Sequence, residues 1–143
     1  MKHIFIDTNV VIDFLARRSQ FFNSACGVIS CSQKGYLILV SSLSFATTSY
    51  ILAAHHKMPE QAIKNIFANF VNTCRITTVD TVTISDAISS QFTDFEDAMQ
   101  YSSALHSGAD VITSRNKSDF QSSIIPVYEP QEFLDLLTRQ SDS

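Results

Sequence analysis

Short apolar runs alternate along this chain with segments of helical periodicity. The runs have the length and composition of strands, and we predict strands over 4–6, 36–40, 75–79, 110–113 and 126–128. In the segments between them, apolar residues recur every three or four positions, which indicates helices with one buried face. We predict these helices over 10–16 continuing into 21–32, and over 41–56, 59–70, 82–90, 94–106 and 130–139.

Strands that alternate with helices are typical of a parallel sheet covered by helices on both faces. The run 36–40 is apolar at every position, as expected of a strand that is buried on both sides. We therefore predict an α/β fold of three layers, α/β/α, with a central parallel sheet of about four to five strands. A length of 143 residues indicates a single domain over 1–143, with 141–143 as a frayed tail.

Composition adds limits to this picture. No apolar stretch reaches the roughly 18 residues needed to cross a bilayer, and the first residues lack the pattern of a signal peptide. The three cysteines form no CxxC motif, so we expect reduced thiols in a cytoplasmic protein that contacts no membrane. A net charge of −4 argues against a large nucleic-acid-binding face, although it leaves room for a small one.

Three acidic segments stand where predicted strands end or predicted helices begin. Asp7 directly follows the strand 4–6, the segment 94–97 opens a predicted helix, and Asp119 comes shortly after the strand 110–113. In open parallel sheets, ligands bind beyond the carboxyl ends of the strands. We therefore expect the three segments to converge at one edge of the sheet.

Grouped carboxylates favour a metal site. Mg²⁺ and Mn²⁺ prefer oxygen ligands, and carboxylates that lie together repel one another unless a cation is present. Each residue alone has a structural explanation: Asp7 could cap a helix, Asp97 could interact with the helix dipole, and Asp119 and Asn116 could be turn residues. The grouping, more than any one residue, indicates metal chemistry.

Three segments together resemble the PIN domain family. They are IFIDTNV at 4–10, DFEDAMQYSSAL at 94–105 and ITSRNKSDF at 112–120. The resemblance extends from residue 1 to about residue 137 and implies the α/β/α fold predicted above. PIN domains are metal-dependent ribonucleases, and many small bacterial members resemble VapC-type toxins that are paired with an antitoxin.

The resemblance also implies roles for individual residues. Asp7, Asp97 and Asp119 match the family's acidic positions and would be both metal ligands for Mg²⁺ or Mn²⁺ and catalytic residues, together with Asn116. Glu96 is the nearest rival to Asp97. The further residues that the resemblance places at the site are Thr8, Asn9, Thr47, Glu96 and Thr113 as supporting groups, and Arg115 and Lys117 as contacts to RNA phosphates, with solvated surface charge as the alternative for the last two.

One departure from the family pattern lies in the helix predicted after the second strand. The family usually carries a Glu there, whereas the stretch 42–52 contains no acidic residue and Thr47 takes the Glu position. A hydroxyl can contact a metal but carries no charge. The site is therefore either a weakened nuclease or a degenerate one that keeps the fold and the partner.

The favoured function is a metal-dependent endoribonuclease, acting on RNA phosphodiesters and serving as the toxin of a toxin–antitoxin pair. Its partners would be RNA, an antitoxin protein and a second copy of itself in a homodimer. The alternative is a catalytically degenerate PIN-like binding module, whose exposed apolar stretch 10–15 would form an interface. A response-regulator receiver is disfavoured, because the second strand ends at Val40-Ser41 without a phosphoacceptor Asp.

Overall fold

The computed structural model describes residues 2–141 and contains one sheet of five strands, all parallel, in the order β3-β2-β1-β4-β5. The strands are β1 (His3–Ile6), β2 (Leu37–Ser41), β3 (Arg75–Thr77), β4 (Val111–Thr113) and β5 (Val127–Tyr128). The predicted α/β/α architecture with a parallel sheet is confirmed, and each strand lies within about two residues of its predicted range.

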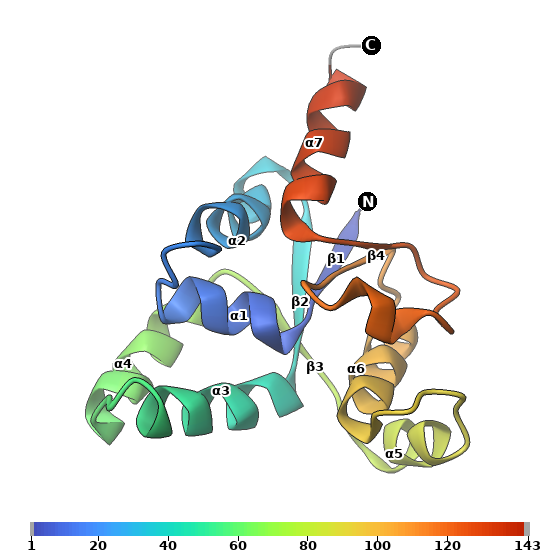
Figure 1. Ribbon diagram of the computed structural model, residues 1–143, viewed down its shortest axis with the longest axis horizontal. Helices are drawn as coiled ribbons and strands as arrows, with labels where there is room; N and C mark the ends of the chain where they lie inside the picture. Colours follow the sequence, from blue (N-terminus) through green and yellow to red (C-terminus); the bar gives the residue numbers. More distant parts are fainter. Residues whose placement is uncertain (1, 142–143) are drawn as a thin grey trace.

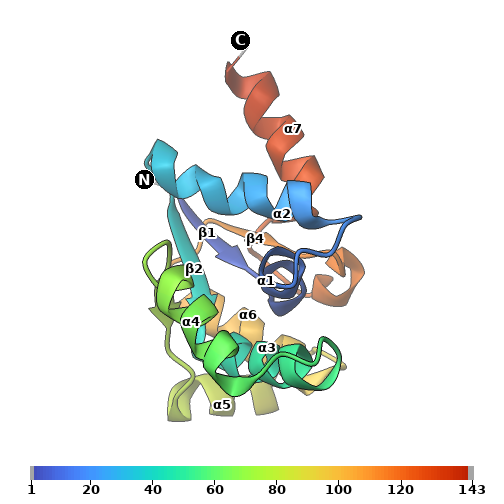
Figure 2. The same ribbon diagram turned by 90° about the vertical axis from the view of Figure 1, so that its left-hand side faces the viewer.

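Helices cover both faces of this sheet. They are α1 (Thr8–Leu15), α2 (Phe22–Ile29), α3 (Ser42–Ala54), α4 (Glu60–Phe70), α5 (Thr81–Ile88), α6 (Phe95–His106) and α7 (Pro130–Ser141), with short 3-10 helices η1 (Ser30–Lys34) and η2 (Lys117–Phe120). Helices α2 and α7 lie on one side of β1 and β2, and α5 and α6 lie on the other (Figures 1 and 2). Three layers result.

Side chains alternate along the central strand β1 and fill the two cores. Ile4 and Ile6 pack in the core shared with α1, α2 and α7, whereas Phe5 packs in the core formed with α6 and η2. Because side chains point to opposite faces at successive positions of a strand, the next residue, Asp7, lies on the same side as Phe5. The register of β1 therefore directs this carboxylate toward α6.

Two boundary predictions were wrong. The helix expected to continue from 10–16 into 21–32 is two helices, because Arg17 takes a left-handed backbone conformation with φ of 52° and ends α1. Ser141 is the last residue of α7 rather than part of a frayed tail. The remaining tail residues, Asp142 and Ser143, lie outside the described residues.

The apolar stretch 10–15 is not the exposed surface that the sequence suggested. Val10, Val11 and Ile12 are at most 6% exposed and belong to the core beneath α1. Phe14 and Leu15 are partly buried against the same core. An interface that uses α1 could therefore involve only its last turn.

Two expectations from composition can be compared with the structure. Within residues 2–141, no helix is both long and apolar enough to cross a membrane. Cys26, Cys31 and Cys74 are all free thiols, as expected, and Cys31 is buried.

Candidate active site

Asp7 lies at the topological switch point of the sheet, where the side on which successive strands are added changes. From β1 the chain adds β2 and β3 on one side, and β4 and β5 follow on the other. Ligands of open α/β sheets bind at such switch points, outside the carboxyl ends of the strands. Here the backbone NH of Asp7 donates to the Thr113 carbonyl (2.9 Å), and the hydroxyl of Ser114 donates to Asp7 Oδ2 (2.8 Å).

Four donors surround the Asp7 carboxylate, which is only 5% exposed. Oδ1 accepts from the backbone NH of Thr8 (2.8 Å) and from Gln100 Nε2 (3.2 Å), and Oδ2 accepts from Ser114 Oγ (2.8 Å) and Asn9 Nδ2 (3.3 Å). The first of these bonds makes Asp7 the N-cap of α1. Burial nevertheless raises the pKa of Asp7 above its ordinary value, and the nearby charge of Asp119 adds to the increase.

Gln100 is the site residue that the sequence reasoning missed. It lies on α6, is 1% exposed, and donates through Nε2 to Thr8 Oγ1 (2.9 Å) and Ser44 Oγ (2.9 Å) as well as to Asp7. Its Oε1 accepts from the hydroxyl of Ser41, the N-cap of α3. The available signal was its position three residues after Asp97, which places both on neighbouring parts of the helix surface.

The helical spacing of Ala98, Tyr101, Ser102 and Leu105 predicts that these residues face the core, and the structure confirms this only in part. Ala98 and Ser102 are buried and Tyr101 is partly buried, as expected, but Leu105 is 42% exposed. The buried polar Gln100 stands instead on the face directed at Asp7. The pattern of apolar residues therefore does not identify the face of α6 that contacts Asp7.

Asp97 stands in the first turn of α6, as predicted. Asp94, directly before the helical segment, is predicted from its residue type to be the N-cap, and the backbone NH of Asp97, which donates to Asp94 Oδ1 (2.9 Å), confirms this. The pKa of Asp97 is raised to about 7, first by burial and then by the charges of Asp7, Asp94, Asp119 and Glu96. A carboxyl group with this pKa marks a place where negative charge is concentrated and a cation would be favoured.

Asp119 and Asn116 belong to the segment that follows β4. Asn116 precedes η2, its backbone NH donates to Ser114 Oγ (3.0 Å), and its carbonyl accepts from the NH of Asp119 (2.9 Å). This chain of bonds connects η2 to the hydroxyl that holds Asp7. Asp119 itself is exposed, and its charge raises the pKa of both Asp7 and Asp97. The three acids therefore lie close enough to influence one another, while their chemical roles stay predictions.

The predicted supporting residues differ in how directly they contact the site. Thr8 and Asn9 contact the site directly, through the bonds described above and through Thr8 Oγ1 to Ser44 Oγ (2.8 Å). Thr113 is fully buried and contributes its carbonyl. Thr47 Oγ1 donates to Glu96 Oε1 (3.2 Å), so the α3 position that lacks the expected Glu is in contact with a carboxylate from α6.

Arg115 and Lys117 are both engaged in ion pairs within the protein. Arg115 Nε donates to Asp13 Oδ2 at 2.6 Å, and its guanidinium lies 4.0 Å from the centre of the Phe21 ring. Lys117 Nζ donates to both carboxylate oxygens of Glu132 (3.1 and 3.2 Å). Contact of either residue with RNA stays a prediction, and for Arg115 it would compete with a short ion pair.

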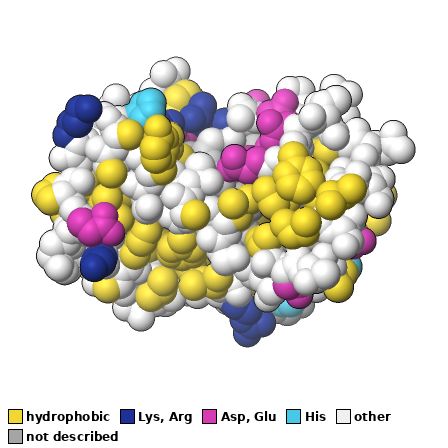
Figure 3. Space-filling model, turned by 90° about the horizontal axis from the view of Figure 1, so that it is seen from below, with side chains coloured by type: hydrophobic (Ala, Val, Ile, Leu, Met, Phe, Trp, Pro, Cys, Tyr) yellow, Lys and Arg dark blue, Asp and Glu magenta, His cyan; other side chains and the backbone are white. Residues whose placement is uncertain are grey.

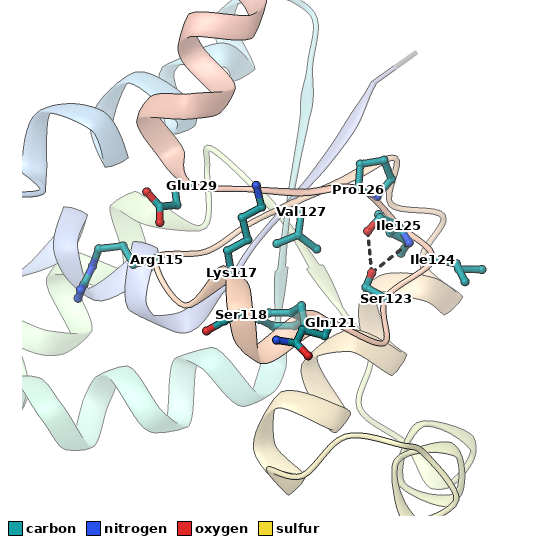
Figure 4. A pocket seen from close by; sticks show the side chains of 11 residues that line it. Arg115, Lys117, Ser118, Gln121, Ser123, Ile124, Ile125, Pro126, Val127 and Glu129 are labelled. Carbon is teal, nitrogen blue, oxygen red and sulfur yellow. Dashed lines mark hydrogen bonds between the residues drawn. The ribbon is translucent and has the colours of Figure 1, made fainter.

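A surface pocket lies beside η2, and it is separate from the acids. Figure 4 shows Ser118, Gln121 and Ser123 around it, with Arg115 directed away from them. The full lining is Arg115, Lys117, Ser118, Phe120, Gln121, Ser123, Ile124, Ile125, Pro126, Val127 and Glu129. Because Asp7, Asp97 and Asp119 are not among the lining residues, this pocket does not define the active site.

The donor chemistry of the acids suits a hard divalent cation, although the side chains are not gathered into a finished site. Across residues 2–141, no three Asp, Glu, His or Cys side chains are grouped tightly enough to hold a metal ion. Figure 3 shows several acidic side chains lying together on one face, beside a hydrophobic area. Mg²⁺ and Mn²⁺ bind carboxylate oxygens and neutralise the repulsion between them, so the chemistry of Asp7, Asp97 and Asp119 suits these cations.

The raised pKa of Asp97 predicts how metal-free stability depends on pH. Between about pH 4 and about pH 7, the folded protein retains a proton on Asp97 that the unfolded chain has released. Since the unfolded state then binds fewer protons, stability falls as the pH rises through this range. We expect the melting temperature to fall more steeply for the wild type than for Asp97→Asn when both are followed by thermal denaturation in EDTA, and parallel curves would contradict this.

The parallel three-layer fold, with acidic residues at its switch point, is typical of α/β proteins that bind ligands at the edge of the sheet. The PIN domain family model matches residues 3–118, and the chain belongs to this family. No curated protein sequence matches the chain significantly. Family membership thus rests on the domain model, and it confirms the resemblance drawn from the three sequence segments.

Solved structures with the same fold include a toxin–antitoxin complex. VapBC2 from Rickettsia felis bound to a promoter DNA fragment superposes with a TM-score of 0.65 at 14% identity, over 89% of this chain and 97% of that one. FitAcB from Neisseria gonorrhoeae gives 0.64 at 16% identity, over 90% and 98%. A toxin–antitoxin complex from Klebsiella pneumoniae gives 0.65 at 17%, over 89% and 97%. At these identities the likeness establishes the fold.

Proposed function

We propose that this protein is a metal-dependent endoribonuclease of the PIN type. The observation that carries the proposal is the buried carboxylate of Asp7 at the switch point of the sheet. The charge of Asp119 raises the pKa of Asp7, and the charges of Asp7 and Asp119 both raise the pKa of Asp97. PIN domains are usually nucleases. A further neighbour in fold, VapC20 from Mycobacterium tuberculosis, is a toxin that cleaves the sarcin-ricin loop and shares 16% identity with this chain.

In this proposal, Asp7, Asp97 and Asp119 would hold Mg²⁺ or Mn²⁺, with Asn116 beside them. When bound, such a cation activates a water molecule and stabilises negative charge on a phosphodiester oxygen. The protein contributes orientation: Ser114, Asn9 and the Thr8 NH fix the plane of the Asp7 carboxylate. The helix dipole of α6 adds partial positive charge behind Asp97.

A protein antitoxin is the partner that the comparisons support, because one neighbour in fold is a toxin–antitoxin complex. A groove between α1, α2 and α4 offers an apolar surface for it, lined by Phe14, Leu15, Arg17, Phe22, Ile66, Asn69, Phe70 and Thr73. A homodimer is a further prediction from the family.

The proposal is tested by cleavage of a mixed RNA substrate with Mn²⁺ and with EDTA, followed on gels. We expect cleavage that requires Mn²⁺ and stops in EDTA. Uptake of Mn²⁺ should be measured in parallel, because the charges that raise the pKa of Asp97 predict that the folded protein binds the cation. Cleavage that persists in EDTA would contradict a metal mechanism.

A second candidate function is a degenerate PIN module that only binds a partner. Two observations favour it: Thr47 replaces the expected acid, and both oxygens of Asp7 already accept two hydrogen bonds each. A cation would have to displace one of these donors. A well-folded protein that takes up no Mn²⁺ at millimolar concentration and cleaves no RNA would support this function over the nuclease.

A further inference from the structure

The buried amide of Gln100 connects four elements around one carboxylate. Its Nε2 reaches Asp7 after β1, Thr8 on α1 and Ser44 on α3, and its Oε1 accepts from the Ser41 hydroxyl at the end of β2. The side chain is 1% exposed and projects from α6. Burying an amide is favourable only when its hydrogen bonds are made, so this position is built around polar contacts rather than packing.

We propose that Gln100 is a positioning residue for Asp7: it fixes the orientation of the carboxylate, so that the carboxylate is already directed for a cation before one binds. This inference rests on the proposed metal-dependent function. It assigns to Gln100 a task that none of the acidic residues can perform, because a neutral donor can approach Asp7 without repulsion.

The distances show what holds the Gln100 amide in position. An amide NH₂ has two hydrogens, yet Nε2 has three acceptors, at 2.9 Å (Thr8), 2.9 Å (Ser44) and 3.2 Å (Asp7). The bond to Asp7 is the longest of the three. The two shorter bonds, to the Thr8 and Ser44 hydroxyls, and the bond from the Ser41 hydroxyl to Oε1 hold the amide in place without help from Asp7. The position of Gln100 therefore does not depend on Asp7, and the amide can orient the carboxylate.

Helix α3 supplies uncharged partners to this arrangement. Ser44 contacts Gln100, and one turn later Thr47 contacts Glu96, so two hydroxyls of α3 face the first turns of α6. No acid from α3 is available to organise the site. On that side, uncharged groups orient Asp7: the amide of Gln100 and the hydroxyls that hold this amide.

The first test is metal affinity in Gln100→Met, which preserves length and removes the polar contacts. Loss of groups that orient a metal ligand typically lowers metal affinity by 10- to 100-fold, and we expect a decrease of about that size in Mn²⁺ affinity, measured by electron paramagnetic resonance of free Mn²⁺. Gln61→Met, at an exposed position of α4, is the matched control and should bind as the wild type. Unchanged affinity in a folded Gln100→Met would overturn the proposal.

The second test needs no metal and exchanges the amide with the carboxylate. Gln100→Glu places a second carboxylate against Asp7 and should lower the melting temperature in EDTA at mildly alkaline pH. Adding Asp7→Asn restores an amide–carboxylate pair in reverse, so the double variant should melt higher than Gln100→Glu alone. Strictly additive effects of the two substitutions would show that the side chains do not interact and would overturn the proposal.

The two tests separate this inference from the proposed function. A wild type that binds no Mn²⁺ would refute the metal-dependent nuclease, whereas the exchange experiment would still decide whether Gln100 holds Asp7. If the wild type and Gln100→Met bind Mn²⁺ with equal affinity, the proposed nuclease function stands, but Gln100 is not part of its site.

Discussion

Replacing Asp97 by Asn is expected to lower Mn²⁺-dependent RNA cleavage by at least about a hundredfold, since loss of a direct ligand should cost no less than loss of an outer contact. The fold should survive, because Asp97 is half-buried and its backbone NH, which Asp94 caps, is retained. Stability without metal near neutral pH should even rise, as Asn carries no charge beside Asp7 and Asp119. Activity and stability are thus expected to change in opposite directions.

The control for this experiment is Glu96→Gln, on the preceding residue of α6. Glu96 is exposed and accepts a hydrogen bond from Thr47, so its loss should affect cleavage much less than the loss of Asp97. Cleavage rates and melting temperatures should be measured for both variants. If Glu96→Gln abolished cleavage and Asp97→Asn did not, the assignment of the α6 acid would have to move by one residue.

The elements of the fold were predictable because their signals are local. Strand 36–40 is apolar throughout, and Asp94 precedes its helix as an N-cap, so both appear in the structure near the predicted residues. The break between α1 and α2 was not predictable in the same way. It depends on Arg17 at a positive φ, a conformation that sequence patterns signal well only for Gly or Asn.

The residues of the candidate site also differ in how well the sequence predicts them. The proximity of Asp7, Asp97 and Asp119 was predictable because each stands at the end of a strand or the start of a helical segment, where topology brings distant residues together. Gln100 was not found, because its importance comes from contacts with three other segments that no spacing along the chain encodes. Polar residues inside a helix are read from sequence as surface, and only the packing of α6 against α3 and β1 shows otherwise.

Arg115 illustrates how a site residue inferred from a motif can have a structural task. Its guanidinium pairs with Asp13, which is 1% exposed, through bonds of 2.6 and 3.3 Å. Arg18 makes a longer contact with the same carboxylate, at 3.4 Å. The bonds join the segment after β4 to α1, so Arg115 connects the loop that carries Asp119 to the helix that Asp7 caps.

Arg115→Met is therefore expected to destabilise the protein by about 3 kcal/mol, the lower end of the cost of leaving a buried charge without its partner, because Arg18 still compensates in part. Urea denaturation measures the loss. Lys117→Met is the control, since the Lys117–Glu132 pair is exposed on both sides and such pairs contribute about 0–1 kcal/mol. If Arg115→Met kept its full stability and lost only affinity for RNA, the ion pair would be incidental and Arg115 would be the phosphate contact that the motif implies.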